Sequence, residues 1–115
     1  MTRVTLRTDA GGSLTVCESK GHSGYAEAGD DIVCAAVSAL CITCLNSLEA
    51  LAGLTPAVEG GSDGYLRFAL PRELTEAQRH DAQLLMSALR LGLEDIAREY
   101  PSNLKLTILN GGKQS

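Results

Sequence analysis

The sequence is poor in aromatic residues, with no tryptophan, one phenylalanine and three tyrosines among 115 residues. A hydrophobic core in this chain must therefore be built mainly from aliphatic side chains. Hydrophobic residues make up 44% and charged residues 21% of the sequence, close to the averages for soluble globular proteins. This composition excludes a fibrous or disordered chain, and the length predicts one domain over residues 1–115.

An excess of basic residues is also missing. The formal net charge is −4, the sequence pI is near 5.0, and the ten Lys and Arg residues are scattered along the chain. Proteins that bind nucleic acids usually gather Lys and Arg into a basic surface that neutralises phosphates. The composition of the whole chain therefore predicts no direct nucleic acid binding.

Neither a secretory signal nor a clear membrane span is evident. The first ten residues alternate between polar and apolar, without the charged start and apolar run of a signal peptide. The longest apolar stretch, residues 32–44, is interrupted by Ser38 and Thr43 and is short for a bilayer crossing. We therefore expect a cytoplasmic protein without membrane contact. Its four cysteines are then expected as thiols, at Cys17, Cys34, Cys41 and Cys44.

The start of the chain has the pattern of a β-hairpin. Residues 2–8 and 13–19 both alternate between polar and apolar side chains, which is the period of a half-buried strand. Between them, Asp9-Ala10-Gly11-Gly12 has the composition of a tight turn. Residues 20–30 show no periodicity and contain three glycines, which predicts a mobile loop.

Strand-like patterns return in the second half of the sequence. Residues 56–70 surround a glycine-rich turn at residues 60–64 and predict a second hairpin. Its stronger arm is residues 65–70, and the other arm would be a short extra strand near Val58. Residues 104–109 alternate once more and predict a final strand.

Two helices are predicted between these strands. Residues 31–52 form a helical pattern that is apolar on nearly every side, so one side is available to a second copy of the protein. Asp30 or Asp31 is placed to cap its start, and Gly53 to end it. A capping box at residues 75–78 starts a second helix, which Pro101 stops. The apolar stripe expected on this second helix consists of Ala77, Leu84, Leu85, Ala88, Leu91 and Ile96.

The order of the elements is β-β-α-β-α-β. Two hairpin patterns and two isolated helices favour an α+β fold. We predict a two-layer sandwich in which both long helices lie on one face of a mostly antiparallel sheet.

Cys34 is the first candidate for chemistry. It falls in the first turn of the predicted long helix, where unpaired N–H groups and the helix dipole favour an anion such as a thiolate nucleophile. The N–H groups of Cys34 and Ala35 could also donate to the oxyanion of a tetrahedral intermediate. Asp31 acts in the opposite direction, because a carboxylate one turn earlier disfavours the thiolate. The sequence leaves the net effect undecided.

His22 is the natural partner of Cys34. It lies in the loop that leads into the helix, twelve residues before the cysteine, so its imidazole can plausibly reach the sulfur. Such a pair forms a thiolate–imidazolium nucleophile and needs no cofactor. The flanking glycines, Gly21 and Gly24, give the loop freedom to close over a substrate, and Tyr25 offers an apolar surface.

Other cysteine and histidine patterns are less informative. Cys41-Ile42-Thr43-Cys44 is a C-x-x-C sequence, but it lies about two turns inside an apolar helix, where packing is the better interpretation. Cys17 does not complete a zinc spacing with it, so we predict no metal site. His80 is expected to be a solvated helix residue, and it is an alternative base only if the fold brings it beside Cys34.

Two strings closely resemble the signature of the ribosomal-processing cysteine protease family Prp: Gly21-His22-Ser23-Gly24-Tyr25-Ala26-Glu27 and Asp31-Ile32-Val33-Cys34-Ala35-Ala36-Val37-Ser38. The match is specific from Gly21 to Leu40, and the chain length and element order also fit the family. Ser23 and Ala28 depart from the family pattern. Both lie in the loop, where they affect substrate fit more than the Cys–His pair.

The resemblance implies a specific activity. A Prp-like protein is a homodimeric cysteine endopeptidase that removes the N-terminal extension of a large-subunit ribosomal protein precursor with a Cys–His dyad. The dyad positions correspond here to Cys34 and His22. Supporting or substrate-binding positions are Gly21, Gly24, Tyr25, Asp31, Ala35 and Ser38.

One alternative class of function remains open at this stage. The chain could be a non-catalytic ribosome-assembly or peptide-binding module of the same fold, with Cys34 packed in the core. A cysteine in an apolar helix is usually a small core residue. Selective alkylation of Cys34 ahead of the other thiols would distinguish the enzyme from this module.

Overall fold

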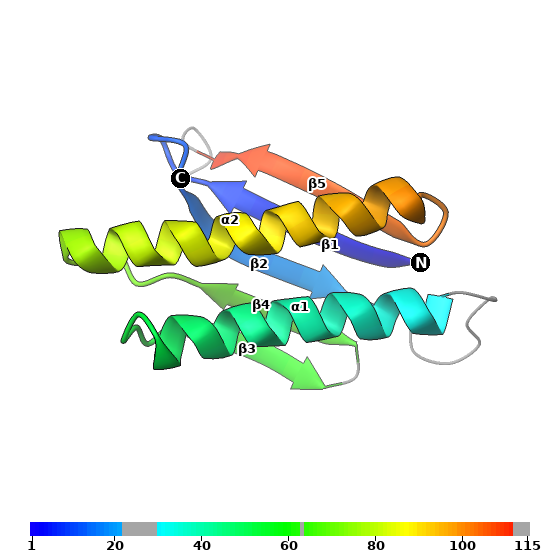
Figure 1. The fold of residues 1–115 in the computed structure, drawn as a ribbon, viewed down its shortest axis with the longest axis horizontal. Helices are drawn as coiled ribbons and strands as arrows, with labels where there is room; N and C mark the ends of the chain where they lie inside the picture. Colours follow the sequence, from blue (N-terminus) through cyan, green and yellow to red (C-terminus); the bar gives the residue numbers. More distant parts are fainter. Residues whose placement is uncertain (22–29, 63, 112–115) are drawn as a thin grey trace.

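The computed structural model describes residues 1–21, 30–62 and 64–111. These described residues form five strands and two helices (Figure 1). In chain order these are β1 (Thr2–Thr8), β2 (Leu14–Lys20), α1 (Asp30–Ala50), β3 (Ala57–Ser62), β4 (Tyr65–Ala69), α2 (Glu76–Glu99) and β5 (Leu104–Asn110). The predicted order is confirmed, and β3 is the short strand expected near Val58.

The strands form one sheet in the order β3-β4-β2-β1-β5. Neighbouring strands pair antiparallel except for β1 and β5, which are parallel, so the sheet is mixed. Both helices cross the same face of the sheet and leave the other face uncovered (Figure 1). The predicted α+β sandwich is confirmed.

Helix α1 begins at Asp30 and ends at Ala50, so its predicted bounds were one or two residues late. Asp30 and Asp31 are the first and second residues of the helix, so neither is its N-cap, which corrects both capping options. The preceding position lies outside the described residues. Gly53 follows the helix with a φ of +69°, a conformation that glycine adopts without strain.

The length of α1 also corrects the argument about membrane spanning. The stretch from Asp31 to Ala50 has a mean hydropathy of 1.8 and is long and apolar enough to cross a bilayer by composition alone. The core helix of a soluble protein passes the same test. Here α1 packs against α2, β1 and β2, with Val33, Val37 and Leu48 fully buried.

Helix α2 begins as predicted, but its buried side is different. The Thr75 side chain accepts a hydrogen bond from the Gln78 backbone, and the Gln78 side chain accepts one from the Thr75 backbone, both at 3.1 Å. This is the expected capping box. The buried residues are Ala82, Met86, Leu89 and Leu93, whereas Leu84 and Leu91 are each 64% exposed. The expected stripe was right for Leu85 and Ile96, which pack against the core, and wrong for its other four residues, which are exposed. Leucines occupy several sides of this helix, and only packing decides which side is buried.

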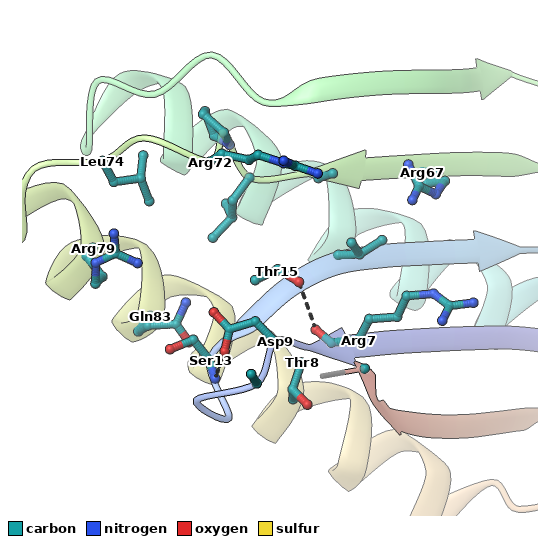
Figure 2. Close-up of a pocket in the computed structure, with 16 residues that line it drawn as sticks. Arg7, Thr8, Asp9, Ser13, Thr15, Arg67, Arg72, Leu74, Arg79 and Gln83 are labelled. Carbon is teal, nitrogen blue, oxygen red and sulfur yellow. Dashed lines mark hydrogen bonds between the residues drawn. The ribbon is translucent and has the colours of Figure 1, made fainter. Parts of the chain in front are cut away.

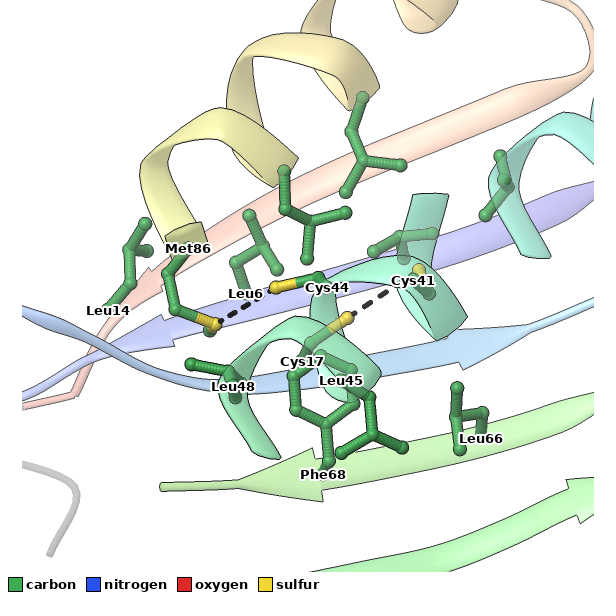
Figure 3. Packing of buried hydrophobic residues seen from close by; sticks show 14 of the residues in the cluster. Leu6, Leu14, Cys17, Cys41, Cys44, Leu45, Leu48, Leu66, Phe68 and Met86 are labelled. Atoms are coloured by element: carbon green, nitrogen blue, oxygen red, sulfur yellow. Dashed lines mark hydrogen bonds between the residues drawn. The ribbon is translucent and has the colours of Figure 1, made fainter. Parts of the chain in front are cut away.

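The core between the helices and the sheet contains three of the four cysteines (Figure 3). The sulfur atoms of Cys17 and Cys41 lie 3.8 Å apart, and the Cys44 sulfur lies 3.8 Å from that of Met86. Burial raises the pKa of the Cys44 thiol to about 12. The hydrogen bond to Cys41, together with burial, also raises the pKa of Cys17. The C-x-x-C sequence is therefore core packing, as predicted.

Candidate active site

Cys34 differs from the other cysteines in its exposure. It is the fifth residue of α1 and is half-buried, whereas Cys17, Cys41 and Cys44 are buried. A thiol that takes part in nucleophilic chemistry must be accessible to its substrate. Cys34 is therefore the one cysteine of this chain in a position to react in the folded state.

Gly21 brings the end of β2 against the Cys34 sulfur. Its backbone N–H donates a 2.6 Å hydrogen bond to the carbonyl oxygen of Gly64, which fixes the chain at this point. A Cβ atom at position 21 would lie 2.8 Å from Cys34 Sγ, closer than side-chain carbons normally approach. The contact between the strand end and the sulfur therefore requires glycine at position 21.

A small cavity of about 80 Å³ opens beside Cys34. It lies between α1, the end of β2 and the β3–β4 hairpin. Of the residues predicted for the site, Gly21, Cys34 and Ser38 line this one cavity. Ser38 follows Cys34 by four residues, which places it on the same face of the helix. The remaining lining residues are Ser19, Cys41, Ile42, Gly61, Ser62, Gly64, Tyr65 and Leu66.

Other predicted site residues are not part of this cavity. Asp31 and Ala35 are exposed and do not line it. His22, Gly24 and Tyr25 lie outside the residues that the structure describes. The start of α1 also bears on the oxyanion prediction. A helix leaves about four N–H groups free at its beginning, and in a helix that begins at Asp30 these precede Cys34 and Ala35. The helix start therefore argues against these two amides as oxyanion donors.

Sequence reasoning missed the contribution of the β3–β4 hairpin. Gly64 accepts the Gly21 hydrogen bond, and Tyr65 lines the cavity while its hydroxyl donates to Glu18 at 2.9 Å. The glycine-rich turn was a visible signal, because glycines often mark a close approach of two backbones. Its proximity to Cys34 arises only from the sheet order, in which β4 pairs with β2.

A larger cavity, of about 670 Å³, lies at the other end of β2 (Figure 2). Its lining contains four arginines and no cysteine or histidine, so thiol chemistry is not assigned to it. The lining residues are Arg7, Thr8, Asp9, Ala10, Ser13, Thr15, Val16, Arg67, Ala69, Leu70, Pro71, Arg72, Leu74, Arg79, Gln83 and Gly111.

The remaining candidates have no role in the cavity beside Cys34. His80 is exposed, its Nδ1 lies 3.2 Å from Asp81, and it does not line that cavity. Within residues 1–21, 30–62 and 64–111, no group of three or more His, Cys, Asp or Glu side chains is arranged to hold a metal ion.

Comparison with known proteins identifies the family. The family model described as cysteine protease Prp matches residues 1–105. The ribosomal processing cysteine protease Prp of Bacillus subtilis is 37% identical over 108 residues, which cover 93% of this chain and 96% of the relative. The chain belongs to the Prp family. The protein of the same name from Staphylococcus aureus is 27% identical and covers 92% of this chain, with 97% of the relative covered.

Solved structures agree with this assignment. A Streptococcus mutans protein is 35% identical, with a TM-score of 0.82 over 96% of this chain and 95% of that chain. The S. aureus Prp protease in complex with a substrate peptide also has a TM-score of 0.82, at 25% identity over 94% of this chain and 99% of that chain. This Prp-family chain is accordingly a cysteine protease, which sets the non-catalytic alternative aside.

Proposed function

We propose that this Prp-family cysteine protease removes the N-terminal extension of a large-subunit ribosomal protein precursor in the cytoplasm, with a Cys34–His22 dyad. The observation that carries the proposal is the half-buried Cys34 thiol beside a cavity at the end of the sheet. The relatives named ribosomal processing proteases support the substrate class, and the S. aureus complex supports a peptide as the bound partner.

The proposed reaction uses two groups. The His22 imidazole accepts the Cys34 thiol proton while the sulfur attacks the scissile carbonyl carbon. Collapse of the tetrahedral intermediate breaks the C–N bond, and His22 protonates the leaving amine. Water, deprotonated by His22, then releases the acyl group from sulfur. In this proposal Gly21 holds the strand end against the nucleophile, and Ser38 borders the bound peptide.

The decisive experiment is cleavage of the precursor's N-terminal peptide by the wild type, Cys34→Ala and His22→Ala. His80→Ala is the matched control, because it removes the other histidine at an exposed position away from the cavity. We expect both dyad variants to lose activity by at least about a hundredfold and the control to retain it. Cleavage retained by Cys34→Ala would refute the nucleophile, and cleavage retained by His22→Ala would refute the dyad.

We also propose that the protein is a homodimer that associates through α1. Ile32, Ala35, Ala39 and Ile42 follow helical spacing and are all exposed, which forms an apolar stripe on the side of α1 away from the core. Such stripes often mark protein–protein contacts.

Sedimentation velocity tests this proposal with Ile32→Glu, which places a charge in the stripe. We expect the variant to become monomeric while the wild type remains a dimer. Leu84→Glu is the control, because Leu84 is similarly exposed but lies on α2. A wild type that is monomeric at micromolar concentration would contradict the proposal.

A further inference from the structure

The uncovered face of the sheet carries a row of three basic residues. Arg3 on β1 pairs directly with Lys20 on β2 and with Lys105 on β5. All three are exposed, and because they are opposite one another they project to the same side of the sheet. We call this set the cationic row.

The stability of the fold does not explain the cationic row. Neighbouring strands lie about 5 Å apart, and like charges directly opposite each other destabilise a sheet. Among the residues that the structure describes, the side chains of Arg3, Lys20 and Lys105 form no hydrogen bond or ion pair that would offset this repulsion. An anionic ligand above the sheet would relieve it.

The rest of the open face strengthens its positive charge. Arg7 and Arg67 project to the same face as the cationic row, because their positions on β1 and β4 are in register with it. Among the described strand residues, two acidic side chains lie on this face: Glu59 lies 3.6 Å from Arg67 and offsets its charge, and Glu18 accepts a hydrogen bond from Tyr65. The acidic residues of the chain gather instead on α1 and α2.

The larger cavity extends this surface. Arg7 lines it, four residues beyond Arg3 on β1, which is roughly 13 Å at the rise of a strand. Arg72 also lines it (Figure 2). Within the described part of the chain, neither guanidinium has a hydrogen-bond or ion-pair partner. Asp9 lies in the same cavity lining, so the cavity is not purely basic. On the described strands, basic residues outnumber acidic ones, and the open face carries a net positive charge.

We propose that the open face of the sheet binds the phosphate backbone of a nucleic acid. Phosphates are bound by separate Lys and Arg charges and need no pockets for side chains. A peptide would instead need pockets or a free strand edge, and the cationic row lies across β5, β1 and β2 on the flat of the sheet. Among the described strand residues, Tyr65 is the one aromatic side chain in line with this row, and contacts to phosphates carry no sequence information. Binding is therefore independent of sequence and strongly dependent on salt.

This inference goes beyond proteolysis. The overall acidity of the chain predicts no contact with nucleic acid. Net charge, however, does not show where charges lie, and in this fold acidic and basic residues are concentrated on different faces. Arg3 and Lys105 do not line the cavity beside Cys34, which lies on the helix that covers the other face, whereas Lys20 directly precedes Gly21 at the edge of that cavity.

The experiment measures binding of a fluorescent single-stranded RNA by anisotropy over a series of salt concentrations. The double variant Arg3→Gln/Lys105→Gln removes two charges from the row. Arg90→Gln/Arg98→Gln is the matched control, because it changes the net charge equally on α2, where both arginines form ion pairs. We expect the slope of log K against log salt to fall by about 1.4 in the first variant, or about 0.7 per lost contact, and to stay unchanged in the control. A DNA strand of the same sequence should bind similarly.

Three outcomes would overturn the inference: no RNA binding by the wild type at low salt, equal weakening in both double variants, or preferential binding of polyglutamate over RNA. Cleavage of the precursor peptide is measured on the same samples and should be unchanged in both variants. A failure of RNA binding with intact cleavage therefore rejects this inference alone, and a failure of cleavage with intact RNA binding rejects only the proposed protease function.

Discussion

At the scale of single residues, the surroundings of Cys34 depend on the fact that Gly21 has no side chain. The backbone at Gly21 is held by Gly64 and lies against the sulfur. A larger residue at position 21 would not need to unfold the protein, because the Cys34 side chain has one torsion through which it can rotate away. That rotation would move the proposed nucleophile out of the cavity.

We therefore predict that Gly21→Ala lowers kcat/KM for the precursor peptide at least about tenfold while the free energy of unfolding changes by only about 1 kcal/mol. Gly11→Ala is the control, since a Cβ there meets nothing closer than 3.5 Å. Peptide cleavage and the alkylation rate of Cys34 are the measurements. A variant with wild-type values for both would show that the close contact has no role in positioning the sulfur.

The buried thiols predict a dependence of stability on pH. Burial raises the pKa of Cys44 to about 12 from its ordinary value of 9.0, so above pH 9 the unfolded chain loses a proton that the folded chain retains. This stabilisation is fully present below pH 9 and is lost as the pH rises towards 12. The free energy of unfolding should fall by up to about 1.4 kcal/mol per pH unit for this thiol in this range.

Urea denaturation at several pH values tests this prediction. In Cys44→Ala the free energy of unfolding should fall less steeply above pH 9, because Cys17 is then the remaining buried thiol with a raised pKa. An equal fall in the variant and the wild type would show that Cys44 does not contribute.

At the scale of elements, the β3–β4 hairpin forms one wall of the site. Gly60 has a φ of +80°, and a Cβ there would overlap the carbonyl oxygen of Tyr65. Gly12, in the β1–β2 turn, has a similar φ of +88° but meets nothing within 4 Å. An alanine would be strained by the positive φ at both positions, but only at Gly60 would its Cβ also overlap another atom.

We predict that Gly12→Ala destabilises the protein by about 1 kcal/mol through strain alone, and that Gly60→Ala destabilises it by at least about 2 kcal/mol. Chemical denaturation of both variants measures the difference. If both variants lose the same free energy of unfolding, the structure around Gly60 shifts to accommodate the added Cβ without further loss of stability.

The start of α2 offers a second test at this scale. Thr75 caps the helix by accepting a hydrogen bond from the backbone of Gln78. Thr75→Ala should lower the free energy of unfolding by about 1 kcal/mol, whereas Thr75→Ser should retain most of it because serine is an equally good cap. An alanine variant as stable as the serine variant would mean that the cap contributes nothing measurable.

At the scale of the whole molecule, charge is divided between the two layers. The helices carry most of the acidic residues, and the open face of the sheet carries the cationic row. This division predicts how stability responds to salt, independently of any ligand.

Arg3→Gln removes the middle charge of the cationic row and should stabilise the protein by a few tenths of a kcal/mol at low ionic strength. The gain should vanish near 1 M salt, where charges are screened within about 3 Å. Arg98→Gln, which breaks the ion pair with Asp95, should show no such gain. Thermal melts at low and high salt measure both effects, and a loss of stability in Arg3→Gln would show that Arg3 is not repelled by its neighbours.

Much of the fold was determined by local patterns. Alternation located β1, β2 and β5, and the capping box located the start of α2. The run ending in Cys34-Ala35-Ala36-Val37-Ser38 indicated the proposed nucleophile. These features depend on residues close together in the chain, so they can be predicted from the sequence. The apolar stripe of α2 could not be read in this way, because its leucines offered more than one side.

The sequence by itself therefore determined which elements form and which cysteine is a candidate nucleophile. Only the tertiary structure decided that β4 pairs with β2, that Gly64 thereby meets Gly21, and that Arg3, Lys20 and Lys105 lie in one row. The physical reason is that pairing between distant strands is set by the burial of one sheet face under both helices. Composition averaged along a chain does not show which charges that pairing brings together.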